Sequence, residues 1–420
     1  MSKTHYFIIQ LHAVLSIMGY WCMHSILTAV VGETSSIASI AYDGLQLIVS
    51  LHVMMICKKD FMIERGRTML SFYSIILILY SLRMVFDMLI GPFTSQVSMG
   101  MFLNDIFLTV FHTFTAVWAM ITSRRYLDIN TIVRILFIMS LVTVVFIIIT
   151  YSKGTLDYDY EEQRISGGRG LNSLALAKIG AITVLSAIHL LLNDRKKKQK
   201  PLYIVGVILG LWLALASGSR GALVALIIAL AIYWVFASRR NVLLLIPALV
   251  AIVLILIYLV PILFWLSDYF PVVGQRMLAT IIEDDQSGRQ ELRIQAIKLI
   301  LDNPVFGYSY RLNPTETGYG PHNGILSIFL ALGVPIGLLF IVFAYIKPII
   351  IAIKIMPRRD TFLATTMCVL FLVNSMSGSS ITEPCFGFSI CLLASIYYYK
   401  TNNDVYSSNI QPYVNELFKS

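Results

Sequence analysis

The sequence has few charged residues for its length. Of its 420 residues only 13% are Asp, Glu, Lys or Arg, whereas 57% are hydrophobic. Soluble domains average ~25% charged and ~45–50% apolar residues. This composition excludes an ordinary soluble domain and indicates a membrane protein, in which the architectural unit is an apolar helix of roughly 20 residues.

Cysteine is also scarce, and its spacing is irregular. Five cysteines lie in or beside apolar runs, namely Cys22, Cys57, Cys368, Cys385 and Cys391. An odd number without regular spacing excludes a disulfide-stapled domain and a cysteine-based metal site. No pair of histidines has the spacing of a metal site either. We therefore expect neither a metal nor another cofactor.

The net charge of +9 is not gathered in one basic segment. The lysines and arginines are dispersed among loops that flank apolar runs, which argues against nucleic acid as a partner. A lipid bilayer is the partner that this pattern predicts, because basic loops orient a membrane protein.

The apolar runs predict an all-α integral membrane protein with about twelve transmembrane helices in one polytopic domain, residues 1–420. The expected spans are 6–31, 36–57, 68–91, 100–122, 131–151, 172–192, 202–217, 221–237, 241–265, 322–346, 361–377 and 386–399. The first run lacks a small-residue cleavage site after a short core, so we expect a retained helix rather than a signal peptide.

The distribution of charge between alternate loops predicts the orientation. The loops 32–35, 92–99 and 378–385 contain no lysine or arginine, whereas the intervening loops contain basic runs such as Arg124-Arg125 and 195–200. Under the positive-inside rule the basic loops are cytoplasmic. Both termini are therefore expected in the cytoplasm, and the segment 266–321 between spans nine and ten becomes a long, partly helical periplasmic loop.

Within this loop the sequence predicts a helix with two arginines on one face. Ser287 and Gln290 resemble a capping box, and Asn303-Pro304 is a stop signal. Arg289 and Arg293 then lie four residues apart beside the helix N-terminus. Such a terminus, with forked arginine donors, favours a phosphate ligand. The alternative is a solvated face on which the arginines pair with Glu283, Asp285 or Glu291.

Two further basic segments are expected at the outer surface. Ser219 and Arg220 lie in the tight turn 217–221, where the arginine either accompanies an anion or snorkels to the membrane edge. Arg164 lies in the Gly-rich segment 152–171, just before Asn172. This segment either approaches a phosphate closely or serves only as a flexible connection.

A histidine stands where the tenth span begins. His322 and Asn323 follow the long loop directly, at the expected water boundary. Histidine exchanges a proton near neutral pH, so His322 is a candidate acid or base. The histidines inside apolar runs are better explained as polar packing residues.

In this order the fragments resemble the O-antigen ligase and Wzy-type polymerase superfamily of bacterial envelope glycosyltransferases. The matching elements are Arg164-x-Ser166-Gly167 with Asn172, Ser217 to Gly221, Gly288-Arg289 leading to Asp302-Asn303-Pro304-x-x-Gly307, and His322-Asn323 with Gly333-x-x-x-Gly337. Arg293 departs from the family, which often has tryptophan there. The first third of the chain matches by hydropathy only.

The resemblance implies metal-independent glycosyl transfer, with inversion, at the periplasmic face of the bacterial inner membrane. The donor would be an undecaprenyl-pyrophosphate-linked oligosaccharide and no nucleotide sugar would be used. Arg220 and Arg289 would stabilise the pyrophosphate, and His322 would remove the proton of the acceptor hydroxyl. Further substrate contacts would come from Arg164, Arg293, Asn323, Ser219 and Asn172.

The sequence leaves alternatives for the acceptor substrate and for the class of protein. A polymerase would use a second repeat unit and work with a chain-length regulator, whereas a ligase would use lipid A–core; the compact interval from Arg289 to His322 favours a polymerase. A twelve-helix transporter or a flippase for lipid-linked glycans would have similar hydropathy. Transporters, however, place ionisable residues near the bilayer midplane. Here Arg83, Asp87, Asp43, Asp105 and Lys178 are expected within spans, but the densest charge is in the outer loops, which favours an enzyme.

Overall fold

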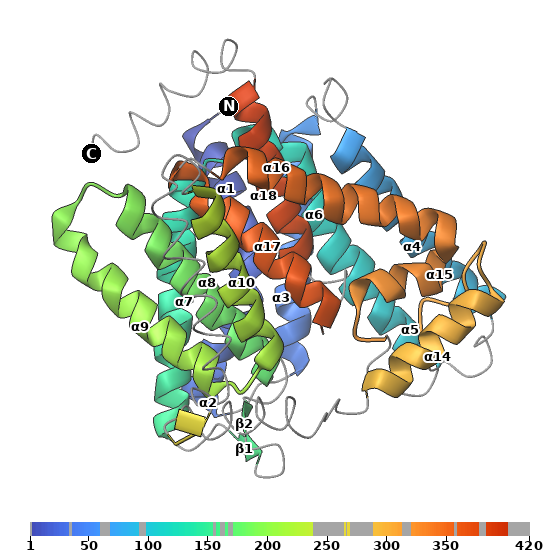
Figure 1. Cartoon of the computed structure of the whole chain (residues 1–420), viewed down its shortest axis with the longest axis horizontal. Helices are drawn as coiled ribbons and strands as arrows, with labels where there is room; N and C mark the ends of the chain where they lie inside the picture. Colours follow the sequence, from blue (N-terminus) through green and yellow to red (C-terminus); the bar gives the residue numbers. More distant parts are fainter. Residues whose placement is uncertain are drawn as a thin grey trace.

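The structure is a computed structural model of a mainly helical chain (Figure 1). It describes residues 2–32, 36–58, 68–91, 98–153, 157–159, 164–166, 171–237, 264–265, 267–268, 289–312, 321–356, 359–377 and 384–401. Within these ranges, eight helices are long and apolar enough to cross a membrane. This agrees with the predicted class of integral membrane protein.

The N-terminal half contains most of the long helices. They are α1 (Lys3–Val14), η1 (Leu15–Gly19) and α2 (Tyr20–Val31); α3 (Ser36–Ile56); α4 (Thr68–Leu89); α5 (Met99–Ile106), η3 (Phe107–Phe114), α6 (Thr115–Ser123) and η4 (Arg124–Tyr126); α7 (Ile129–Ser152); and α8 (Ser173–Asn193). The segments η1 and η3 are π-helical turns inside longer spans.

The C-terminal half completes the bundle. Its elements are η5 (Lys197–Gln199) and α9 (Lys200–Ala216); α10 (Arg220–Ala237); α14 (Arg289–Asp302); α15 (Gly324–Phe340), η7 (Ile341–Ile346) and α16 (Lys347–Ile355); η8 (Arg359–Thr361) and α17 (Phe362–Ser377); and α18 (Pro384–Thr401). Shorter apolar helices at 221–235, 362–376 and 385–397 coincide with predicted spans eight, eleven and twelve. Span nine, 241–265, lies outside the described residues except for 264–265, so the count of twelve stays a prediction.

Polar residues at the ends of the apolar runs determine where several helices begin. Ser2, Ser98 and Asp128 are N-caps whose side-chain oxygens accept hydrogen bonds from backbone N–H groups of α1, α5 and α7. These bonds satisfy donors that the first helical turn leaves unpaired. The periodicity of the apolar residues and these caps together explain why the helices start where they do.

Close packing of small residues joins α8 to α9. The Cβ that a side chain at Gly210 would add lies only 2.8 Å from the carbonyl oxygen of Gly180, so neither glycine can be replaced without separating the helices. Small residues at such a crossing allow two membrane helices to approach closely. Large apolar side chains such as Ile138, Ile204 and Ile208 face outward instead, as a lipid environment requires.

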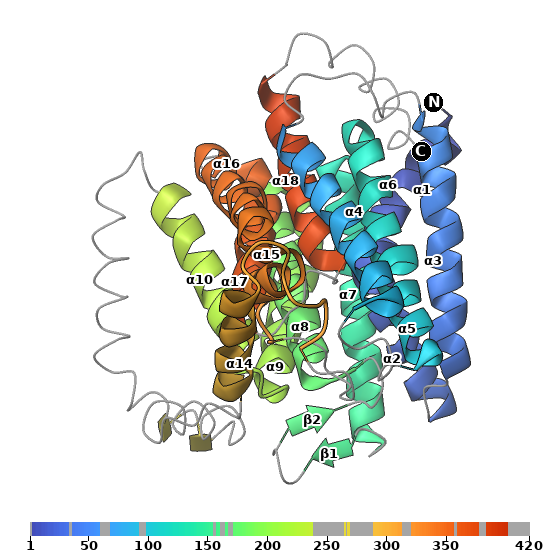
Figure 2. The ribbon, with the colours of Figure 1, turned by 90° about the vertical axis from the view of Figure 1, so that its right-hand side faces the viewer.

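A short hairpin departs from the all-α prediction. Strand β1 (Asp157–Asp159) pairs antiparallel with β2 (Arg164–Ser166), with Asp157 opposite Ser166. The hairpin and α14 lie at one end of the bundle, and the start of α1 and the ends of α16 and α18 lie at the other (Figure 2). The segments that the sequence assigns to the periplasm therefore gather at one end. Which end faces the periplasm stays a prediction from the loop charges.

Candidate functional site

His322 has an unusual backbone conformation immediately before α15. Its φ is +48°, and among the residues that the structure describes no other residue except glycine has a positive φ. This left-handed region costs an ordinary L-residue roughly 1–2 kcal/mol. Such conformations persist only where surrounding contacts impose them, and they are frequent at functional sites. The half-buried His322 is therefore held in place by the residues around it.

The next residue, Asn323, is anchored by three hydrogen bonds. Its Oδ1 accepts hydrogen bonds from the backbone N–H groups of Ile325 at 3.0 Å and Leu326 at 3.1 Å, and its Nδ2 donates to the carbonyl of Met376 at 3.1 Å. Asn323 is thus the N-cap of α15 and a link to the end of α17. The capping position is occupied by Asn323 rather than His322, so capping does not account for the histidine.

The helix α14 packs beside the first half of α15. Leu292, Ala296 and Ile300 of α14 share one apolar cluster with Leu326 and Leu330 of α15. The backbone N–H of Val334 donates to the carbonyl of Pro304 at 2.7 Å, so positions beyond the end of α14 lie beside positions late in α15. Both helices begin at the same end of their contact (Figure 1). Their free N-terminal N–H groups therefore lie at the same end of this contact.

Helix α14, which carries the two predicted arginines, begins at the same end of this contact as α15, which His322 precedes. Arg289 is the first residue of α14, two residues after the predicted start at Ser287, which lies outside the described residues, and the helix ends at Asp302, before the predicted stop. Arg293 is half-buried, and within the described part of the chain its buried Nε has no hydrogen-bond partner. An anion beside the helix N-terminus would satisfy this donor. The side chain of Arg289 lies outside the described atoms.

The turn between α9 and α10 is as tight as predicted. Helix α9 ends at Ala216 and α10 begins at Arg220. Gly218 has φ of +68°, and the hydroxyl of the buried Ser217 accepts a hydrogen bond from the backbone N–H of Ser219 at 3.4 Å. The turn places Arg220 at a helix start. Its side chain lies outside the described atoms, so both interpretations of Arg220 stay open.

Arg164 and Asn172 stand at the hairpin end of the bundle. Arg164 opens β2 opposite Asp159, and its side chain lies outside the described atoms. Asn172 is the N-cap of α8, because its Oδ1 accepts a hydrogen bond from the N–H of Ala175 at 2.9 Å. This cap engages the oxygen of Asn172, so any ligand contact falls to its amide nitrogen.

The structure also contains a buried charged cluster that sequence reasoning missed. The guanidinium of Arg311, which has no exposed surface, donates to Oδ2 of Asp105 from Nε at 2.9 Å and also from a terminal nitrogen. The hydroxyl of Tyr310 donates to the same carboxylate oxygen at 3.0 Å. Burial and the charge of Asp105 raise the pKa of Tyr310. A charge this deeply buried requires such a partner.

A second ion pair extends this cluster. The Nε of Arg83 lies 2.7 Å from Oδ1 of Asp87, as their four-residue spacing permits, and Oδ2 of Asp87 accepts from the backbone N–H of Tyr310 at 2.8 Å. Arg83 also donates to the carbonyls of Phe306 and Tyr308. Charges in α4 and α5 therefore anchor residues 306–311 against the bundle and so fix α14 relative to α15. In the sequence, an aspartate within an apolar span, such as Asp87 or Asp105, was the feature that could have indicated this cluster.

One comparison with known proteins gives a match. Residues 205–341 match the family model described as O-antigen ligase (Wzy_C). The match confirms the family resemblance over about a third of the chain, and it contains Arg220, Arg289 and His322, whereas Arg164 and Asn172 precede it. No curated protein matches the chain, and no solved structure matches it.

Proposed function

We propose that this protein is an integral-membrane inverting glycosyltransferase that uses a glycan linked to undecaprenyl pyrophosphate, at the periplasmic face of the bacterial inner membrane. The observation that carries the proposal is the left-handed conformation of His322, directly before the N-cap Asn323 of α15. This histidine lies within the segment that matches the O-antigen ligase family. An activated glycan and an acceptor hydroxyl are the substrates that such a site would serve.

The arginines stabilise the departing pyrophosphate. As the bond between the anomeric carbon and the phosphate oxygen breaks, negative charge develops on that oxygen. Arg220 and Arg289 stand at helix starts, and Arg293 provides an additional buried donor on the same face as Arg289. Preorganised cationic donors at this point lower the barrier, because they stabilise the transition state more than the ground state.

His322 acts on the acceptor. Its imidazole accepts the proton of the attacking hydroxyl while the oxygen forms a bond to the anomeric carbon from the face opposite the pyrophosphate. The configuration at that carbon is therefore inverted, and the imidazolium returns its proton to solvent after the product leaves. The fixed backbone of residue 322 holds the ring in place, which is the main contribution of a positioned base. No step of this transfer requires a metal ion.

The acceptor that we favour is a second lipid-linked repeat unit, which makes the protein a polymerase. Residues 303–312, about half of the interval between α14 and α15, are packed against α4, α5 and α15. The interval as a whole is short, so it has little chain to form an extension for a large acceptor such as lipid A–core. A chain-length regulator would be a further partner of a polymerase.

Deletion of the gene, followed by analysis of lipopolysaccharide banding, tests the acceptor. A polymerase predicts core with a single repeat unit in the deletion strain, whereas a ligase predicts bare core and accumulated polymer. Unchanged banding would contradict both. A transporter or flippase is distinguished with purified protein in detergent, since only an enzyme elongates a lipid-linked oligosaccharide without a membrane or an ion gradient.

A further inference from the structure

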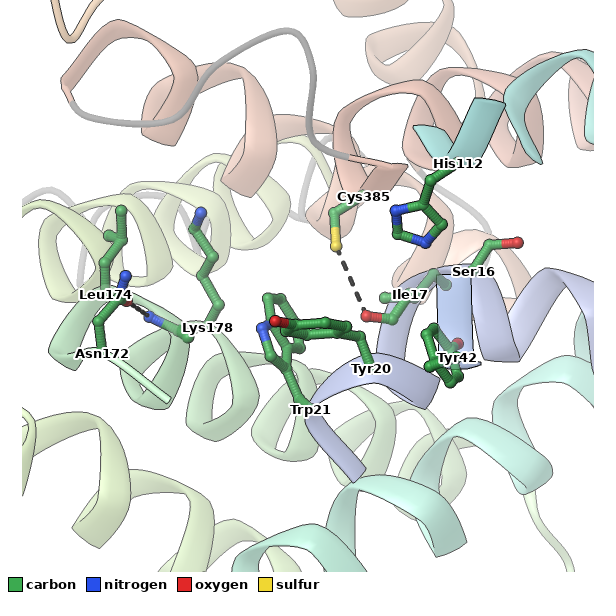
Figure 3. A pocket seen from close by; sticks show the side chains of 11 residues that line it. Ser16, Ile17, Tyr20, Trp21, Tyr42, His112, Asn172, Leu174, Lys178 and Cys385 are labelled. Atoms are coloured by element: carbon green, nitrogen blue, oxygen red, sulfur yellow. Dashed lines mark hydrogen bonds between the residues drawn. The ribbon is translucent and has the colours of Figure 1, made fainter. Parts of the chain in front are cut away.

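A cavity lies inside the N-terminal half of the bundle, apart from the arginines and His322. Its volume is about 250 Å³, and it is bounded by the helix α1–η1–α2 together with α3, η3, α8 and α18 (Figure 3). Tyr20, Trp21, His112, Asn172 and Lys178 are among its lining residues. Ligand sites for drug-sized molecules measure ~300–1,000 Å³. This cavity therefore suits a group the size of one ring.

Two π-helical turns meet at this cavity. Ser16 and Ile17 belong to η1, and His112 belongs to η3. A π-helical turn is rare and often marks a functional site, because the widened turn redirects side chains that a regular helix would place elsewhere. Here both redirected segments contribute side chains to one cavity. Their convergence is an observation independent of the cavity itself.

The start of α8 contributes Asn172, Leu174, Ala175 and Lys178 to the lining of the cavity. Asn172 is exposed at the helix start, whereas Lys178, six residues along, is only 2% exposed. At 1.5 Å per residue the two positions are about 9 Å apart along the helix axis. An ammonium group has three N–H donors, so Lys178 can donate to a ligand in the cavity in addition to its contacts within the protein. Oxygen-rich groups are the ligands that suit such a donor.

The charge around the cavity favours a neutral ligand over a phosphate. Nδ1 of His112 lies 3.5 Å from the buried Asp43, so a carboxylate stands directly behind the lining. The surroundings of the cavity thus include a carboxylate as well as Lys178, whereas a phosphate site gathers positive charge. The cavity therefore suits hydroxyl groups better than a lipid phosphate.

The remaining wall is aromatic. Tyr20 and Trp21 lie on α2, and the rings of Tyr20 and Tyr42 are 5.9 Å apart in an edge-on arrangement. The Tyr42 hydroxyl donates to the carbonyl of Leu15 at 2.7 Å. Aromatic side chains combine an apolar face with a polar tip. A sugar has the matching surface, namely an apolar C–H face and a rim of hydroxyl groups.

We propose that this cavity binds one sugar residue of the glycan substrate and so contributes to the choice of glycan. The sugar ring packs against Tyr20 and Trp21, and its hydroxyls accept hydrogen bonds from Lys178 and the Asn172 amide. The inference rests on the proposed function for the identity of the glycan. It extends recognition into a part of the chain that precedes the matched family segment.

The test uses a phosphate-free probe, namely the repeat-unit oligosaccharide released by mild acid from the lipid-linked oligosaccharide of the same strain. Equilibrium binding is measured with the full-length protein in detergent. Lys178→Met should weaken binding about ten-fold or more, because a charge-assisted hydrogen bond is lost. Thr183→Val is the matched control, since Thr183 is buried on the same helix and its hydroxyl donates only within α8, to Ile179.

A second variant keeps the test decisive if Lys178→Met does not fold. Trp21→Phe retains an aromatic ring but loses the indole N–H and part of the stacking surface, so it should also weaken binding. The inference is overturned if the wild-type protein does not bind the probe at millimolar concentration. It is also overturned if both cavity variants bind the probe as well as Thr183→Val does. Failure of glycosyl transfer with intact probe binding would instead contradict the proposed function alone.

Discussion

Arg311 and Asp105 form a buried ion pair across 206 residues of sequence, with Nε of the arginine 2.9 Å from Oδ2 of the aspartate. The pair joins the segment after α14 to the span that begins with α5. Because neighbouring backbone groups of that segment also bond to Leu330 of α15, the pair helps to set the position of α14 relative to His322. This buried ion pair therefore helps to position the elements of the candidate site.

Removal of one partner of this pair should therefore destabilise the protein. Arg311→Met and Asp105→Leu should each cost about 3–5 kcal/mol, since each leaves the other charge buried and unpaired. The double variant should recover part of this loss, because it leaves neither charge. Thermal unfolding of the detergent-purified variants measures the effect. If the double variant loses as much stability as the two single variants lose together, the residues do not act as a pair.

Gly333 marks a reversal of direction within α15. Its φ of 78° and ψ of 176° lie in a region that is essentially restricted to glycine, and an added Cβ would overlap the carbonyl of Val305. Gly333→Ala should therefore lower the melting temperature and reduce expression.

Gly44→Ala is the matched control for this prediction. Gly44 lies inside α3 with no atom within 4 Å of an added Cβ, so alanine there should be neutral or stabilising by roughly 0.5–1 kcal/mol. A Gly333 variant as stable as the Gly44 variant would contradict the assigned role of the reversal.

The loop charges predict which positions are exposed to the periplasm. In a cysteine-free background, single cysteines at 160, 285 and 316 should react with a membrane-impermeant thiol reagent in cells with a permeabilised outer membrane. A cysteine at 198, in the basic loop, should react only after lysis. Labelling of position 198 in unlysed cells would reverse the orientation and remove the site from the periplasm.

The arginines should contribute chiefly to turnover. Arg220→Ala and Arg289→Ala should each lower the rate by ~10²–10³, the usual effect of removing one donor to a developing oxyanion. Lysine should rescue only partly, because it lacks the bidentate fork. Arg195→Ala, in the basic loop at the other end of the bundle, is the charge-matched control. Near-normal transfer by either alanine variant at matched expression would remove that arginine from the mechanism.

Several features could be read from the sequence because they depend on local chemistry. Asn303-Pro304 predicted the end of α14, and the turn at 217–221 followed from two apolar runs without room for a loop. The spacing of Arg83 and Asp87 allowed the ion pair that the structure contains. Each of these depends on residues that are close in the sequence.

Other features depend on contacts that sequence spacing does not encode. In Pro321-His322-Asn323-Gly324 glycine is the residue that most readily adopts a positive φ, yet Gly324 is helical and His322 has the positive φ, while Asn323 is the N-cap. The partner of Asp105 comes from another part of the chain altogether. The π-helical turns η1 and η3 are likewise invisible to a search for a 3.6-residue period.

The most direct test of the proposed chemistry is transfer by purified protein that carries His322→Asn. Asparagine tolerates the left-handed conformation and forms hydrogen bonds, but it cannot accept a proton near neutral pH. With lipid-linked oligosaccharide as donor and acceptor, and without nucleotide sugar or ion gradient, the wild-type protein should elongate the glycan and release undecaprenyl pyrophosphate. The His322→Asn variant should fold and bind the donor but lose ~10²–10⁴ in rate. No elongation by the wild-type protein, or at least half the wild-type rate in the variant, would contradict the account.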